Sequence, residues 1–184
     1  MSSPDLGFEL ATESHRVRRT FGFIDLSKFT TYGNTYGDDR AVAQLSTFRS
    51  IVRSVGSATG VRVAKWLGDG AMLVALDPVG MMSAVLRILR QCSANELDLD
   101  LHGGIAEGHV ILFEGDDYIG VTVNLAARLA DAAKPGQVLA PVELVPGIER
   151  TEAVIGPIVV PGFALPVDVA DITRAVSLVE SRNL

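Results

Sequence analysis

Apolar and polar positions follow two different periods along the chain, and each period predicts a different kind of element. A short apolar run from Thr20 to Asp25 predicts a buried strand. From Asp38 or Asp39 to about Ser57, apolar residues recur at helical intervals, which predicts an amphipathic helix closed by Gly60. Between these two elements, Ser27 is a candidate N-cap for a shorter helix that begins at Lys28.

The strongest β-hairpin pattern lies at residues 63–74. Two runs of β-forming residues flank Gly68-Asp69-Gly70, and glycine supplies the positive φ that such a tight turn requires. Lys65 and Asp69 place opposite charges near one end of this hairpin. These charges indicate either a solvated turn or a functional site.

The rest of the pattern predicts a mixture of helices and strands. We expect a helix that starts at Asp77-Pro78 and is broken at 95–98, strands at 99–106 and 109–113 around a Glu107-Gly108 turn, a helix over 121–133, and strands at 137–140, 153–160 and 166–172. This order predicts an α+β sandwich of ferredoxin-like topology, with helices packed on a mainly antiparallel sheet.

Composition narrows the class of protein. The chain has 184 residues, enough for one domain, which we place at 19–184 after a polar lead-in (1–18) that ends in a basic, solvated flank. A net charge of −6 argues against nucleic-acid binding, and no apolar run of about 18 residues predicts a membrane span. The single cysteine excludes a disulfide scaffold, and the N-terminus lacks the pattern of a secretory signal, so we expect a cytoplasmic protein.

Two aspartates are candidates for metal binding. Asp25 ends the first predicted strand and Asp69 lies at the tip of the hairpin. If the strand lies beside the hairpin, both carboxylates project from one edge of the sheet, as at sites where Mg²⁺ or Mn²⁺ binds together with substrate phosphates. The alternative for each residue is an ordinary helix cap or turn.

A second group of polar residues follows on the predicted helix at 121–133. Asn124 and Arg128 are four residues apart and share one helix face, downstream of Asp117. A guanidinium and a directional amide donor suit a phosphate that carries developing charge. The alternative is an exposed face on which Arg128 pairs with Asp131 or Glu107.

Four segments, FGFIDLSKFT, KWLGDGAML, HGGIAEGHV and DDYIGVTVNLAARLADAAKPGQVL, together resemble the class III nucleotidyl cyclases. The resemblance covers about residues 20–172. It implies an adenylyl or guanylyl cyclase that converts a nucleoside triphosphate to the cyclic 3′,5′-monophosphate and pyrophosphate.

The resemblance also implies roles for individual residues. Asp25 and Asp69, with the backbone of Ile24, would hold two divalent cations, Mg²⁺ or Mn²⁺. Lys65 and Asp117 would read adenine, because lysine donates to N1 and aspartate accepts from the 6-amino group; a glutamate at position 65 would suit guanine.

For the sugar and the phosphates, the resemblance implies that Asn124 orients the ribose and Arg128 stabilises phosphate charge. Backbone amides near Ser27, Lys28 and Phe29 would cradle the β- and γ-phosphates. The chain departs from the family at Pro161, where many members carry a phosphate-binding lysine, and His109 falls where some relatives have a basic residue.

In the family's head-to-tail dimer, the metal half of one subunit faces the base-reading half of the other. The expected protein is therefore a homodimeric adenylyl cyclase with ATP as substrate and two composite sites. The alternatives are a guanylyl cyclase and a catalytically weak, cyclase-like module that binds nucleotide or a partner.

Overall fold

The computed structural model describes residues 16–145 and 152–175. The elements in chain order are β1 (Arg16–Leu26), α1 (Phe29–Tyr36), α2 (Asp38–Thr59), β2 (Arg62–Leu67), β3 (Gly70–Ala75), α3 (Pro78–Ala94), β4 (Leu101–Phe113), β5 (Asp117–Ile119), α4 (Val121–Ala132), β6 (Val138–Pro141), the 3-10 helix η1 (Val142–Leu144), β7 (Val154–Ile158) and β8 (Val167–Asp171). In these ranges no helix has both the length and the apolar character needed to cross a membrane.

One mixed sheet organises the fold. Its strand order is β2-β3-β1-β4-β6-β8-β7, and β5 pairs with β4 as a hairpin. The four strands β4-β1-β3-β2 are all antiparallel to their neighbours, which is the predicted ferredoxin-like arrangement, whereas β6 joins β4 in parallel. The predicted fold class is therefore confirmed.

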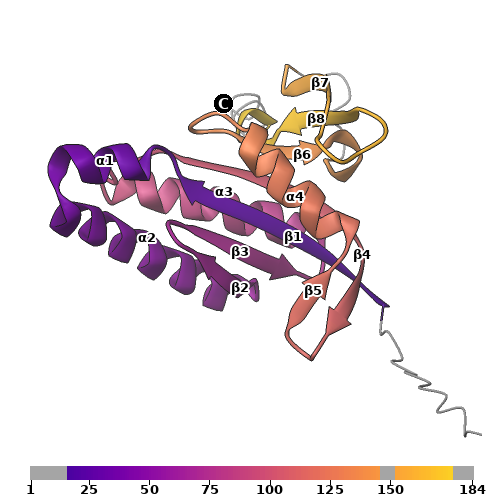
Figure 1. Ribbon diagram of the computed structural model, residues 1–184, viewed down its shortest axis with the longest axis horizontal. Helices are drawn as coiled ribbons and strands as arrows, with labels where there is room; N and C mark the ends of the chain where they lie inside the picture. The colour runs from indigo at the N-terminus through magenta and orange to yellow at the C-terminus, as the bar shows by residue number, and fades with distance from the viewer. Residues whose placement is uncertain (1–15, 146–151, 176–184) are drawn as a thin grey trace, which may run out of the picture.

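The two faces of the sheet are covered differently. Helices α2 and α3 pack on one face and form the largest apolar core with β1, β3 and β4. On the other face α4 lies across β1 and β4, with a smaller apolar cluster beneath it (Figure 1). Phe21, Phe23 and Asp25 alternate onto this second face along β1, so the predicted metal ligand Asp25 lies on the side that carries α4.

The predicted hairpin turn at Glu107-Gly108 is wrong. β4 runs unbroken from Leu101 to Phe113 and pairs with β1 from Leu26↔Leu101 to Arg16↔Ile111. A Cβ atom on Gly108 would collide with Oγ1 of Thr122. The glycine therefore allows close approach of α4 rather than a turn, and the real hairpin lies between β4 and β5.

Two further expectations near the N-terminus need correction. β1 begins at Arg16, so part of the basic run assigned to the lead-in belongs to the strand, where Arg18 pairs with Glu107 at 2.7 Å. Ser27 does not cap α1: the N-cap is Lys28, in a left-handed conformation (φ 60°), and no side chain caps that end. The rest of the predicted lead-in lies outside the described residues.

Candidate active site

Asp25 lies one residue before the end of β1, on the face that carries α4. Its neighbours in the sheet are Gly70 of β3 and His102 of β4. Its carboxylate Oδ1 is buried and has no hydrogen-bond partner among the described residues. Unpaired buried polar atoms are rare in proteins, so this oxygen is a candidate for a ligand-binding or catalytic role.

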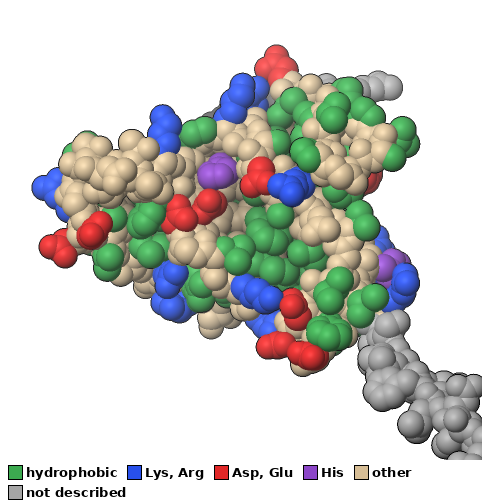
Figure 2. All heavy atoms as spheres, viewed as in Figure 1, with side chains coloured by type: hydrophobic (Ala, Val, Ile, Leu, Met, Phe, Trp, Pro, Cys, Tyr) green, Lys and Arg blue, Asp and Glu red, His purple; other side chains and the backbone are tan. Residues whose placement is uncertain are grey.

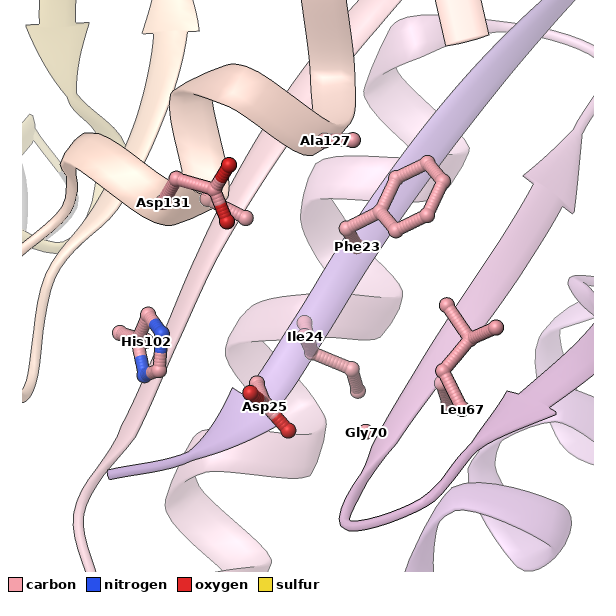
Figure 3. A pocket seen from close by; sticks show the side chains of 10 residues that line it. Phe23, Ile24, Asp25, Leu67, Gly70, His102, Ala127 and Asp131 are labelled. Atoms are coloured by element: carbon pink, nitrogen blue, oxygen red, sulfur yellow. The ribbon is translucent and has the colours of Figure 1, made fainter. Parts of the chain in front are cut away.

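Asp25 lines a pocket of about 240 Å³ between the sheet and α4. His102 and Asp131 line the same pocket, as does Phe23 (Figure 3). Burial raises the pKa of the Asp25 carboxyl above its usual range, and the negative charge of Asp69 raises it further, while His102 and the Leu26 backbone amide act in the opposite direction. The site therefore disfavours the ionised carboxylate unless a positive charge joins it.

Asp69 occupies the tip of the β2–β3 hairpin, which was predicted from the sequence. Leu67 pairs with Gly70, so Gly68 and Asp69 are the two central residues of the turn. Only Gly68 of these two has a positive φ (66°), as a type II′ turn requires at its first central position. Because β3 lies beside β1, this turn brings Asp69 close enough to Asp25 to affect its pKa.

Gly70 serves a different purpose from the turn glycine Gly68. A Cβ atom at position 70 would lie 2.6 Å from Oδ1 of Asp25 and 2.9 Å from the carbonyl oxygen of Ile24. Because Gly70 has no side chain, these two oxygens can lie against its backbone. The second glycine of Gly-Asp-Gly is therefore required by the site and not by the turn.

The connection from β1 to α1 is held by hydrogen bonds. The Ser27 amide donates to the Asp100 carbonyl at 2.7 Å, and Oγ of Ser27 lies 3.0 Å from Nδ1 of His102. The Ser27 amide is therefore not one of the free donors expected for a phosphate cradle. Lys28 and Phe29 stay predictions for that role.

Lys65 and Asp117 come together although they are 52 residues apart. The Lys65 Nζ donates to Oδ1 of Asp117 at 2.8 Å, from β2 to the first residue of β5. The hydrogen bond from Lys65, with a second from the Tyr118 amide, lowers the pKa of Asp117. Both side chains are about half exposed, at 48% and 43%. A ligand can therefore reach both groups.

Asn124 and Arg128 lie on α4 and line a separate pocket of about 470 Å³. The helix is fixed against β4 because Gly104 and Gly108 leave no side chain between them. Arg128 donates to Asp131 at 3.1 Å, which is the pairing expected under the alternative of an exposed helix face. Pro161 lines this pocket, so the position at which the chain departs from the family faces Arg128.

The predicted residues thus form three groups within one chain. Asp25 and Asp69 form the first, Lys65 and Asp117 the second, and Asn124 with Arg128 the third. The pockets of Asp25 and of Arg128 share only Ala127, and the Lys65–Asp117 pair lines neither. Figure 2 shows an apolar area on this face between separate clusters of charged side chains.

The first group fits a divalent cation. Asp25 Oδ1 is buried and unpaired, the Ile24 carbonyl oxygen lies beside the same glycine, and Asp69 adds a second carboxylate. Hard cations take oxygen ligands of this kind. In the described part of the chain no group of three or more acidic, histidine or cysteine side chains is placed to hold an ion, so substrate or water oxygens would complete the coordination.

Three residues of the Asp25 pocket were not assigned to the site from the sequence. His102 and Asp131 line it, and Gly70 makes room for it. Only strand register brings His102 opposite Asp25, and register cannot be inferred from the local spacing of apolar residues.

His109, which was a minor candidate for a basic phosphate contact, is exposed on β4.

Comparison with known proteins gives related sequences and a shared fold. No protein-family model matches the chain. It is 36% identical over 147 residues to an uncharacterized protein of Mycobacterium tuberculosis, a match that covers 79% of this chain and 39% of that protein. It is 34% identical over 124 residues to an adenylate cyclase of Glutamicibacter nicotianae, covering 67% of this chain and 30% of that protein. The matches thus span less than half the length of these relatives.

The adenylyl cyclase CyaB from P. aeruginosa has a similar structure, with a TM-score of 0.70 and 24% identity over 85% of this chain and 94% of that chain. The chain therefore has the fold of a class III nucleotidyl cyclase catalytic domain, and the resemblance seen in its motifs is confirmed. Its relatives in sequence include bacterial proteins named adenylate cyclase.

Proposed function

We propose that this domain is an adenylyl cyclase that converts ATP to 3′,5′-cyclic AMP and pyrophosphate. The observation that carries the proposal is the buried, unpaired Oδ1 of Asp25 beside Asp69. Two neighbouring carboxylates repel each other, and a divalent cation bound between them removes this repulsion. Phosphoryl transfer depends on such charge neutralisation. The relatives named adenylate cyclase support the same reaction class.

In this reaction the ribose 3′-oxygen forms a bond to the α-phosphorus while the bond to the bridging oxygen of the β-phosphate breaks. Pyrophosphate leaves, and the proton of the 3′-hydroxyl passes to solvent. Mg²⁺ or Mn²⁺ held by Asp25, Asp69 and the Ile24 carbonyl would supply Lewis-acid stabilisation of the phosphate charge. Asn124 orients the ribose, and Arg128 donates to the phosphate oxygens on which negative charge develops.

The preference for ATP rests on Lys65 and Asp117. Their hydrogen bond keeps a donor and an acceptor side by side on one exposed edge. The ammonium donates to adenine N1 and the carboxylate accepts from the 6-amino group, a pattern opposite to that of guanine. Asp117 is ionised at neutral pH, as its lowered pKa requires, so its carboxylate accepts hydrogen bonds and cannot donate them.

The separation of the three groups supports a head-to-tail homodimer. Within one chain the pocket of Asp25 contains neither Lys65, Asp117 nor Asn124. A second copy would bring its own base-reading and phosphate-binding residues over the metal pair of the first. Each dimer would then carry two composite sites.

An assay of cyclic nucleotide formation with Mn²⁺-ATP or Mg²⁺-ATP tests the proposal, with purified wild type and Asp25→Ala. We expect wild type to form cyclic AMP and the variant to lose activity by several orders of magnitude. Asp77→Ala is the matched control, because Asp77 caps α3 away from this pocket. Equal activity of Asp25→Ala and wild type would refute the assignment.

A second candidate function has one observation in its favour. Pro161 lines the pocket of Arg128, where a lysine would add charge for the triphosphate. A domain weakened in this way would bind nucleotide or a partner without turnover. Mn²⁺-ATP bound by the protein at high concentration, with no cyclic product, would favour this candidate over the cyclase.

A further inference from the structure

Arg49 connects α2 to the turn that carries Asp69. Its Nη2 donates to the carbonyl oxygen of Gly68 at 2.7 Å. Its guanidinium also lies over the ring of Trp66 in β2, at 5.0 Å from the ring centroid. Arg53, one helical turn further along α2, lies over the same ring at 5.1 Å and, among the described residues, donates no hydrogen bond to the turn.

The carbonyl that Arg49 contacts belongs to the peptide unit joining Gly68 to Asp69. A peptide unit is planar, so fixing its oxygen also fixes the direction of the bond that leads into the Asp69 α-carbon. Gly68 has a positive φ and its backbone is otherwise permissive. Arg49 thus restrains the most adaptable part of the hairpin immediately before the carboxylate-bearing residue.

Packing against Trp66 alone does not explain why an arginine occupies position 49, because burying part of its guanidinium is unfavourable. Its Nε is buried and has no hydrogen-bond partner among the described residues. An apolar side chain of similar length would cover Trp66 without burying an unpaired donor. What such a side chain could not provide is the hydrogen bond to Gly68.

We propose that Arg49 is a positioning residue that orients Asp69 for divalent-cation binding beside Asp25. The inference rests on the proposed function, because it assumes that the two aspartates share a metal. Arg49 acts through the Gly68 carbonyl and does not itself contact the ion. In metal sites, groups that orient the ligands commonly contribute as much as a tenfold to hundredfold difference in affinity.

The test is a titration of the protein with Mn²⁺ alone, without nucleotide. Free Mn²⁺ is measured by electron paramagnetic resonance, whose signal falls as the ion binds, so the readout does not depend on turnover. Arg49→Gln is compared with Arg53→Gln, which loses the same kind of contact with Trp66 but no hydrogen bond to the turn. Trp66 is the single tryptophan of the chain, so its emission reports whether the local packing survives.

We expect Arg49→Gln to raise the Mn²⁺ concentration at half-saturation about tenfold and Arg53→Gln to change it by less than about twofold. Equal binding by Arg49→Gln and wild type would overturn the inference. Equal weakening by both variants would also overturn it, because the effect would then come from Trp66. If Arg49→Gln does not fold, Arg49→Met and Arg53→Met give the same comparison, because methionine can cover Trp66 but cannot donate to the Gly68 carbonyl.

Asp25→Ala, titrated in parallel, separates the two proposals. If Asp25→Ala abolishes Mn²⁺ binding and Arg49→Gln leaves it unchanged, only the role of Arg49 fails. If Asp25→Ala binds Mn²⁺ as wild type does, the metal assignment fails and the role of Arg49 fails with it.

Discussion

Asp25 and Gly70 face each other across β1 and β3, and the carboxylate of the first lies against the backbone of the second. The Oδ1 atom would be 2.6 Å from a Cβ at position 70. The same atom is buried and unpaired. The hairpin therefore contributes to the site in two ways. Its tip carries Asp69, and Gly70, the first residue of β3, leaves room for the carboxylate of Asp25.

This contact predicts that Gly70→Ala impairs the site. The added methyl would push Asp25 and the Ile24 carbonyl away from their positions. Overpacking of this kind costs about 1–3 kcal/mol of stability, and a displacement near 1 Å costs about 100-fold in rate. Thermal unfolding and cyclic AMP formation at saturating Mn²⁺-ATP measure the two effects.

Gly33→Ala is the control for this substitution. Gly33 lies within α1, where a Cβ would meet the Cβ of Ala41 at an ordinary 3.6 Å. We expect unchanged activity and a small gain in stability, up to about 1 kcal/mol, because alanine is the better helix former. A Gly70→Ala protein as active as Gly33→Ala would contradict the spatial role of Gly70.

The raised pKa of Asp25 predicts a gain in stability when its charge is removed. Because the folded-state pKa lies above the unfolded value of 3.8, the folded protein holds the proton more tightly, and stability falls as pH rises through that interval. In buffer with a chelator at neutral pH, Asp25→Asn should therefore unfold at a higher denaturant concentration than wild type. The expected gain is on the order of 1 kcal/mol, at the low end for an unpaired buried polar group.

The gain from Asp25→Asn should disappear below pH 3.8, where the carboxyl is protonated in both states. Added Mn²⁺ should stabilise wild type and not the variant, which lacks the charge that binds it. Urea unfolding across pH, with and without Mn²⁺, measures both expectations. A variant less stable than wild type at neutral pH in chelator would show that the ionised carboxylate is not a cost to the fold.

The fold could be predicted from the sequence wherever apolar residues kept the same spacing along a whole helix or strand. The helix from Asp38 and the hairpin around Asp69 follow from local pattern and turn chemistry. Gly108 misled the prediction because a glycine in a turn and a glycine beneath a helix look alike until Thr122 is placed above it.

The site shows the same limit. Asp25 and Asp69 could be nominated from their residue type and position at element ends. His102 and Gly70 became visible only through strand register, which depends on which strands pair. Ser27 was assigned to a helix cap, but His102 and the Asp100 carbonyl, both distant in sequence, take its hydrogen bonds. Contacts across the sheet therefore decide what local patterns leave open.

The Lys65–Asp117 pair predicts that nucleotide preference depends on position 65. Lys65→Glu should lower kcat/KM for ATP by about 10–100-fold, the effect of losing a hydrogen bond to a charged group, and should shift the ATP-to-GTP ratio toward GTP. Arg62→Ala is the control, because Arg62 lies on the same strand and donates to the hydroxyl of Tyr118 instead. Competition between ATP and GTP measures the ratio.

An unchanged ratio in Lys65→Glu would remove Lys65 from base recognition. Stability should change little in Lys65→Glu, because an exposed ion pair contributes little to the free energy of unfolding. Arg62→Ala should also change it little, because the hydrogen bond that Arg62 donates to Tyr118 is exposed. Loss of activity toward both nucleotides together with a lowered unfolding temperature would indicate a structural role for Lys65 instead.

The separation of the site into groups predicts complementation between two inactive proteins. Under the proposed function, Asp25→Ala would lack the metal half of the site and Arg128→Ala the phosphate-binding half. In a mixed head-to-tail dimer, one composite site combines both defects and the other combines two intact halves. With free exchange of subunits, an equal mixture forms mixed dimers half of the time, so it should recover about one quarter of wild-type activity.

The measurement is cyclic AMP formation as the ratio of the two proteins is varied at constant total concentration. Activity should be highest at equal amounts and close to zero for either protein alone. Asp25→Ala mixed with Asp69→Ala is the matched control, because both substitutions damage the same half and no dimer of the two regains an intact site. Activity that stays at the background level for every ratio, with dimers present by sedimentation, would place Asp25 and Arg128 in the same chain's site.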